Sequence, residues 1–208
     1  MRKYIIAAAA GALLALAPGR ELAAQPWDAG LPGEDIVSVA LRLGAVSPRT
    51  TLTDNTKYSG GLAGGASVTY WATRNIGLRL NYELGKTEGN DIPTSAASHE
   101  DPTVSFFGGE LNLRYPVASG SLVVSPYVGG GAGMKQYDWS LDSTGIDRDL
   151  VFAWNMTGGL DIRPVSSPWI GFVFEAKRYS SKYQWHAMYW DPPMTNDLLF
   201  SAGITLNH

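Results

Sequence analysis

Short and long connectors alternate along this chain. After the first two dozen residues, eight segments with a hydrophobic period of two follow one another. The short connectors are Thr73 to Asn75, Pro116 to Ser121, and Pro164 to Pro168, and each is flanked by long polar connectors rich in Gly, Pro, Asp and Ser. An up-and-down barrel that crosses a membrane has tight turns at one rim and loops at the other. The alternation therefore favours that architecture and predicts both chain ends on the short-turn side.

The segments have the length and the pattern of membrane strands. We expect strands over residues 36–46, 61–72, 76–85, 103–115, 122–137, 150–163, 169–179 and 197–207. In the clearest, 76–85, the apolar residues from Ile76 to Leu84 alternate strictly with Gly, Arg, Asn and Glu. Most of these strands are about 10 to 13 residues long, whereas strands of soluble proteins average five or six and tilted membrane strands need about nine to eleven.

One face of these strands is charged. If that face is the lumen, opposite charges can pair inside while the apolar face meets lipid, and side chains fill the narrow interior of an eight-stranded barrel. Glu83 or Glu110 would pair with Arg42, Arg79 or Arg114. A gated pore is the alternative role. Lys135 shares the charged face, and the predicted structural network of the lumen comprises Arg42, Arg79, Glu83, Glu110, Arg114, Asp161, Arg163, Glu175 and Lys177.

A soluble sandwich or a lipocalin-like barrel would also alternate, with its apolar face inward. Strand length, connector alternation and aromatic positions favour the membrane instead. The aromatic residues near predicted strand ends, where a girdle at the membrane interface belongs, are Tyr70, Tyr82, Tyr115, Trp154 and Trp169. The sequence therefore predicts an all-β fold, an eight-stranded antiparallel up-and-down transmembrane β-barrel.

The N-terminus has the pattern of a secretory signal. Arg2 and Lys3 precede an apolar stretch, Pro18 and Gly19 interrupt it, and small residues follow, so we expect cleavage after Ala24. Residues 1–24 would be the signal peptide and residues 25–208 one barrel domain. A membrane anchor that stays attached is the alternative. The sequence contains no cysteine, and its net charge of −3 gives no electrostatic case for nucleic acid.

Three segments carry a family resemblance. Ser125–Met134, with its run of glycines, resembles the fifth strand of small OmpA-like and OmpX-like outer-membrane barrels. Residues 152–161 resemble their sixth strand and 197–206 their last. The resemblance implies a bacterial outer-membrane protein with periplasmic termini and four extracellular loops, in contact with membrane lipid and lipopolysaccharide and folded by the barrel-assembly machinery. His208 stands where such proteins commonly end in an aromatic residue, and we expect no peptidoglycan-binding domain.

The resemblance implies a structural or surface-interaction role, since fold alone does not settle function. The alternatives are a narrow channel and a lipid A-modifying enzyme, a deacylase or acyltransferase. An esterase needs His, Ser and a carboxylate. The histidines are His99, His186 and His208, and Met188 occupies the place of the serine in the His-x-Ser spacing of lipid A deacylases. We therefore expect no enzyme, no catalytic residue, no cofactor and no metal site.

The long connectors remain the candidate interaction surface. They are acidic and could bind divalent cations, but Asp138 and Asp142 lack the full spacing of a calcium loop, which favours plain solvation. Exposed aromatic clusters often mark a binding surface, although these aromatics could also fold over the barrel rim or enter the headgroups. The candidate surface in the last long connector comprises Tyr183, Trp185, His186, Tyr189 and Trp190.

Overall fold

The computed structural model describes residues 36–48, 51–53, 56–86, 88–90, 103–138, 149–182 and 194–208. The chain divides into two compact units, Met1–Pro32 and Gly33–His208, and the described residues belong to the second. The predicted signal peptide, His99, and the aromatic segment 183–190 lie outside the described residues. Within the described ranges, no helix has the length and apolarity needed to cross a membrane.

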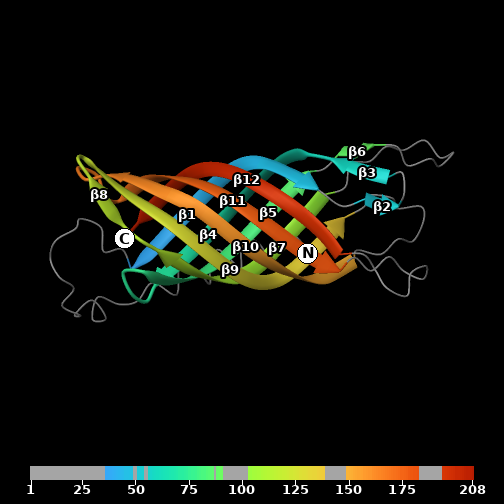
Figure 1. Ribbon diagram of the computed structural model, residues 1–208, viewed down its shortest axis with the longest axis horizontal. Coiled ribbons are helices and arrows are strands. Elements are labelled where there is room, and N and C mark those ends of the chain that lie inside the picture. The colour runs from blue at the N-terminus through green and yellow to red at the C-terminus, as the bar shows by residue number, and fades with distance from the viewer. Residues whose placement is uncertain are drawn as a thin grey trace, which may run out of the picture. The chain divides into compact units, whose positions relative to one another are not determined.

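Eight long strands form a barrel in the second unit (Figure 1). They are β1 (Val37–Pro48), β4 (Gly61–Trp71), β5 (Ile76–Lys86), β7 (Thr103–Arg114), β9 (Leu122–Asp138), β10 (Asp149–Pro164), β11 (Ile170–Lys182) and β12 (Met194–Asn207). Each pairs antiparallel with the next, and β12 pairs with β1 from Ser38↔Asn207 to Pro48↔Asp197, which closes the barrel. The predicted fold is confirmed, and the predicted strand limits agree with the structure to within three residues.

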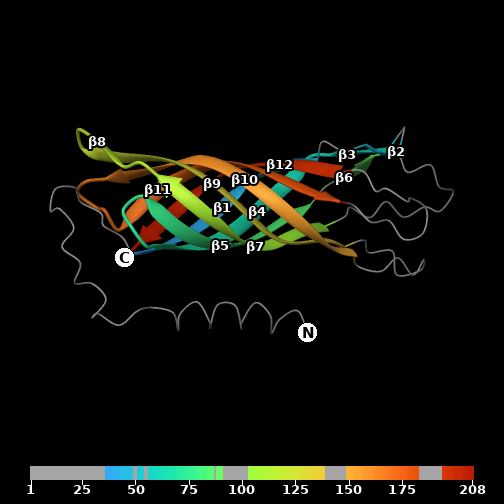
Figure 2. The same ribbon diagram turned by 60° about the horizontal axis from the view of Figure 1, so that its bottom comes forward.

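The short connections lie at one end of the barrel. One contains a strand that the sequence did not predict, β8 (Val117–Ser119), which extends the hairpin by pairing with the start of β9. Gly120 has a φ of +59° in the turn between them, a conformation that glycine adopts without steric strain. The C-terminus and β8 share this end of the barrel in both ribbon views (Figures 1 and 2). We call it the short-turn end.

At the opposite end, parts of the first two long connectors form a small sheet. Its strands are β2 (Thr51–Thr53), β3 (Thr56–Ser59) and β6 (Glu88–Asn90), paired in the order β2-β3-β6. They lie together beyond the barrel strands in both views (Figures 1 and 2). These strands are three or four residues long, too short for a hydrophobic period of two to be recognised in the sequence. We call this end the long-connector end.

The barrel is apolar outside and polar inside. Leu43 and Leu62 are 71% and 74% exposed, whereas Glu110 and Lys177 are 1% and 2% exposed. β5 alternates exposed and buried residues along its whole length, as the period of two predicts. The aromatic residues proposed for the girdle, Tyr70, Tyr82, Tyr115, Trp154 and Trp169, are all exposed. A soluble barrel would have the opposite polarity, so the fold is that of a transmembrane barrel.

Candidate functional site

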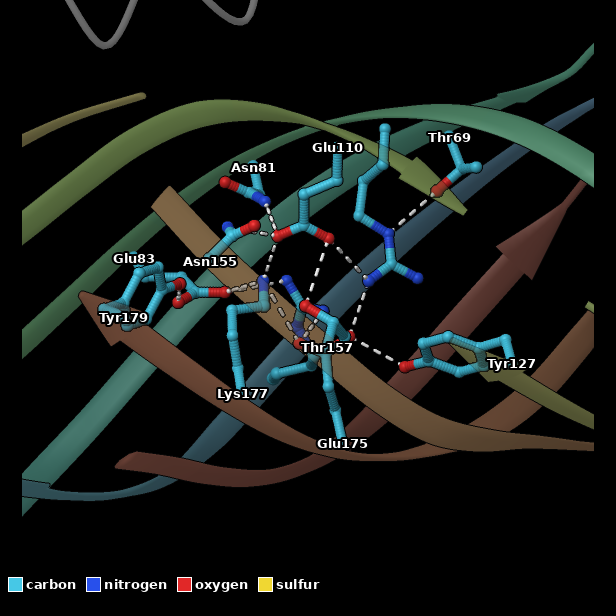
Figure 3. Close-up of polar contacts among 12 residues, drawn as sticks. Thr69, Asn81, Glu83, Glu110, Tyr127, Asn155, Thr157, Glu175, Lys177 and Tyr179 are labelled. Carbon is cyan, nitrogen blue, oxygen red and sulfur yellow. Dashed lines mark hydrogen bonds and ion pairs between the residues drawn. The ribbon is translucent and has the colours of Figure 1, made fainter. Parts of the chain in front are cut away.

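Six charged side chains meet in the middle of the lumen and form what we call the central cluster. Three are cationic and three are carboxylates, so their formal charges balance. They come from four strands, and their side chains are at most 7% exposed. Figure 3 shows Glu83, Glu110, Glu175 and Lys177 converging within the ring of strands. The members are Arg42 on β1, Arg79 and Glu83 on β5, Glu110 on β7, and Glu175 and Lys177 on β11.

Glu175 joins two arginines from different strands. Its Oε1 lies 2.6 Å from Nη1 of Arg42, and its Oε2 lies 2.5 Å from Nη1 of Arg79. The Tyr127 hydroxyl donates to Oε2 at 2.7 Å. Charge-assisted hydrogen bonds are about twice as strong as neutral ones, and here they satisfy a carboxylate whose side chain is fully buried. Glu175 thereby ties β11 to β1, β5 and β9 across the lumen.

Lys177 occupies the centre of the cluster. Its Nζ lies 2.7 Å from Glu110 Oε1, 2.8 Å from Glu83 Oε1 and 3.4 Å from Glu175 Oε1. An ammonium is a compact charge with three donors, so it can serve three carboxylates at once. Two of the pairs that the sequence suggested also form: Arg42 reaches Glu83 at 3.4 Å, and Arg79 reaches Glu110 at 3.6 Å.

Neutral side chains complete the cluster. Glu110 accepts hydrogen bonds from Asn81, from Asn155 at 2.8 Å and from Thr157 at 3.4 Å, and Glu83 accepts one from Tyr179 (Figure 3). Sequence reasoning named only the charged residues. The period of two could have identified the neutral residues. An Asn, Thr or Tyr that lies an even number of positions from an inward-facing charged residue on the same strand also points into the lumen.

Two glycines leave room for side chains in and beside the central cluster. Gly65 on β4 is opposite both Arg42 and Glu83, and a Cβ there would lie 2.7 Å from Cγ of Glu83. Gly159 on β10 is opposite Glu175, and its Cβ would lie 2.5 Å from the ring of Tyr127. Glycine in a strand often marks such a close approach.

Three residues of the predicted network lie outside the central cluster, toward the short-turn end. Nε of Arg163 lies 3.2 Å from Oδ2 of Asp161. Arg114 donates from Nε to the Arg74 carbonyl at 2.8 Å, and its guanidinium carbon lies 3.8 Å from the ring centroid of Trp71. The predicted network is therefore divided between the middle of the lumen and its short-turn end.

Apolar side chains flank the central cluster on both sides. One apolar layer lies in the strand halves next to the long connectors. It includes Phe106 and Tyr179, whose ring centroids are 4.4 Å apart. Its members are Val46, Ala63, Phe106, Ala153, Tyr179 and Leu199. A smaller group, Ala40, Tyr127 and Val173, lies toward the short turns. The sequence did not predict these layers, because Val, Ala and Phe are common on either face of a barrel strand.

A cavity of about 20 Å³ lies between Arg79 and Trp71 and is also lined by Ser125 and Asp161. That volume accommodates about one water molecule. Toward the long connectors, Lys135 forms an ion pair across the lumen with Asp197. The sequence placed Asp197 at the start of the last strand, but the predicted network did not include it. Within the described ranges, no three His, Cys, Asp or Glu side chains are grouped so that they could hold a metal.

Comparison with solved structures identifies barrels of the same kind. Neisserial surface protein A matches with a TM-score of 0.55 and 12% identity over 83% of this chain and 97% of that protein. The outer-membrane protein OprG from Pseudomonas aeruginosa matches with a TM-score of 0.52 and 12% identity over 86% and 99%. The fold is that of the small outer-membrane β-barrels. This bears out, for the fold, the resemblance seen in the sequence. No protein-family model and no curated protein matches the sequence.

Proposed function

We propose that this protein resides in a bacterial outer membrane, where its barrel anchors the long connectors at the outer surface in a structural or surface-interaction role. The observation that carries the proposal is the combination of a charged lumen, closed by its own ion pairs, with an apolar outer wall. Such a wall is stable only where lipid covers it. The relatives in fold, at 12% identity, support the location.

The central cluster favours a closed barrel over a channel. Each carboxylate of the cluster lies within 3.6 Å of at least two cations. Breaking a buried ion pair leaves an uncompensated buried charge and costs about 3–5 kcal/mol of stability. A conducting path would need several pairs to break and the apolar layer beside them to become hydrated. We therefore infer that the lumen serves stability and carries no solute.

A closed lumen leaves the long connectors to carry whatever is particular to this protein. We propose that they face the exterior, with the termini in the periplasm, and that the aromatic segment of the last connector contacts an extracellular partner. Its candidate residues remain Tyr183, Trp185, His186, Tyr189 and Trp190. We infer no catalytic role, and alanine at His186 would then leave the lipid A profile unchanged.

The orientation can be tested with single cysteines, because the native chain contains none. Asn90→Cys, at the long-connector end, should react with an impermeant maleimide on intact cells. Ser119→Cys, in β8 at the short-turn end, should react only after the outer membrane is permeabilised. Equal labelling of both on intact cells would contradict the orientation. Recovery of the protein from periplasmic extract without detergent would contradict the membrane location.

The closed lumen is tested in planar bilayers. The wild-type protein should give no discrete conductance steps at the concentration at which a porin control conducts. Regular, reproducible steps would show that the lumen opens and would replace the structural role with that of a channel.

A further inference from the structure

The outer wall of the barrel carries a groove. It crosses β10, β11, β12 and β1 and has a volume of about 560 Å³. Register places Gly158, Ala176 and Phe200 side by side in one row, and Leu160, Phe174 and Ala202 in the next. The small residues form the floor, and the large exposed ones form the rims. A Cβ on Gly158 would meet no atom within 4 Å, which confirms that this part of the floor is open.

A cation, Arg178, stands just beyond the end of the groove nearer the long connectors. Arg178 follows Ala176 on the same outward face of β11, about 7 Å further along the strand. Its neighbours across the sheet are Met156 on β10 and Leu198 on β12, and its guanidinium is directed toward Asn196, further along β12 toward the long connectors. Nε and Nη2 donate to Oδ1 of Asn196 at 3.1 and 2.8 Å. This arrangement holds the guanidinium plane in place and leaves other N–H groups directed elsewhere.

We propose that this groove binds one membrane lipid, with its phosphate on Arg178 and an acyl chain along the floor of Gly158, Ala176 and Ala202. The groove is apolar where the chain would lie, and a fixed guanidinium matches the geometry and charge of phosphate. The inference rests on the proposed function, since the wall must face lipid and the long connectors must lie at the headgroup level. In the proposed orientation the lipid belongs to the outer leaflet.

A second copy of the chain is the competing occupant, and charge argues against it. Among the outward-facing strand residues whose side chains the structure describes, none is an Asp or Glu. A copy packed against this groove with its own outer wall would therefore bury Arg178 without a carboxylate partner. An uncompensated buried charge strongly destabilises an interface. A phosphate-bearing lipid supplies both the anion and the apolar chain.

The test is native mass spectrometry of the full chain, released from detergent micelles after titration with dimyristoyl phosphatidylglycerol. One lipid should bind the wild type, whereas dimyristoylglycerol, which lacks the phosphate, should bind at least tenfold more weakly. Inorganic phosphate at millimolar concentration should not displace the lipid. Arg178→Gln should weaken lipid binding about tenfold, the loss of one charge-assisted contact, and Arg178→Lys should retain most of it. Gly158→Leu fills the groove and should weaken binding to a similar extent.

Two matched controls make the result specific. Lys86→Gln removes an outward-facing cation from β5. Lys86 lies near the long-connector end, as Arg178 does, but on a strand that does not border the groove. Gly109→Leu adds the same side chain to the outer face of β7, where a Cβ makes only ordinary contacts at 3.8 and 3.9 Å. Both should bind lipid within twofold of the wild type. Heat-modifiable migration on a detergent gel verifies that each variant is folded.

The outcomes separate the two proposals. Equal losses in Arg178→Gln and Lys86→Gln, or in Gly158→Leu and Gly109→Leu, would mean general lipid coverage and would overturn the groove as a site. A dimer that Gly158→Leu abolishes would overturn the lipid as occupant. A wild-type protein that shows no heat-modifiable barrel and needs no detergent would overturn the proposed function itself.

Discussion

The central cluster predicts a large loss of stability for one isosteric substitution, Glu175→Gln. The carboxylate contacts Arg42 at 2.6 Å, Arg79 at 2.5 Å, the Tyr127 hydroxyl at 2.7 Å and Lys177 at 3.4 Å. The amide keeps the volume but leaves three cations facing two carboxylates, and its NH₂ group points a donor at other donors. Breaking a buried pair in this way costs about 3–5 kcal/mol, so we expect the free energy of unfolding to fall by that amount.

Asp161→Asn is the matched control. It is also a carboxylate-to-amide change on the inner face, but its side chain is 13% exposed and its contacts are longer, 3.2 Å to Arg163 and 3.4 Å to Thr205. We expect a loss of about 1 kcal/mol. Urea titration in lipid vesicles, followed by the fluorescence of the seven tryptophans, gives both values from the midpoint and the slope.

A double variant tests whether charge balance is the cause. Adding Lys177→Gln to Glu175→Gln restores neutrality, so the double variant should be more stable than the sum of the two single losses predicts. If Glu175→Gln destabilises the barrel no more than Asp161→Asn does, or if the two single losses simply add, the central cluster does not stabilise the fold as we argue.

Three further predictions concern the lumen and the wall. Gly159→Ala should destabilise the barrel by about 1–3 kcal/mol, because its Cβ would lie 2.5 Å from the ring of Tyr127. Gly158→Ala, one residue away on the open outer face, should change the free energy of unfolding by less than about 0.5 kcal/mol. The folded fraction on a detergent gel compares the two variants. Leu80→Arg, midway along β5 on the outer face, should lower the free energy of unfolding in a bilayer by about 2–4 kcal/mol. Leu122→Arg, at the short-turn end, should lower it by only about 0–1 kcal/mol, and urea unfolding from vesicles measures both. Tyr179→Phe removes a hydroxyl that donates to the buried carboxylate of Glu83, and it should lower the free energy of unfolding by about 1.5–3 kcal/mol in the same assay. An unchanged free energy of unfolding would show that this hydrogen bond is not maintained.

The barrel could be predicted from the sequence because two independent patterns agree. The period of two from Ile76 to Leu84 fixes which face is apolar, and the alternation of connector lengths fixes the order of the strands. Neither pattern gives the relative positions of strands along the barrel axis. The interior partners of Lys177 could therefore not be assigned, although its place on the inner face was correct.

The rest of the site depends on contacts between distant strands. Tyr127 and Tyr179 read as ordinary strand aromatics until the register brings their hydroxyls to Glu175 and Glu83. The apolar layer around Phe106 could not be predicted either, since Val, Ala and Phe occur on both faces of barrel strands and their type does not show which of them face the lumen. The outer groove arises only when Gly158 on β10 lies opposite Ala176 on β11.

In the folded barrel the apolar face of the strands meets lipid and the polar face fills the lumen. Nitroxide labels on single cysteines at Leu111 and at its neighbour Asn112 test it most directly, since Leu111 is 54% exposed and Asn112 is fully buried. In lipid vesicles, the label at 111 should collide with dissolved oxygen and not with an aqueous nickel chelate, and the label at 112 should collide with neither. A label at 112 that is open to the nickel chelate, beside one at 111 that is shielded from both reagents, would contradict the account and restore the soluble alternative.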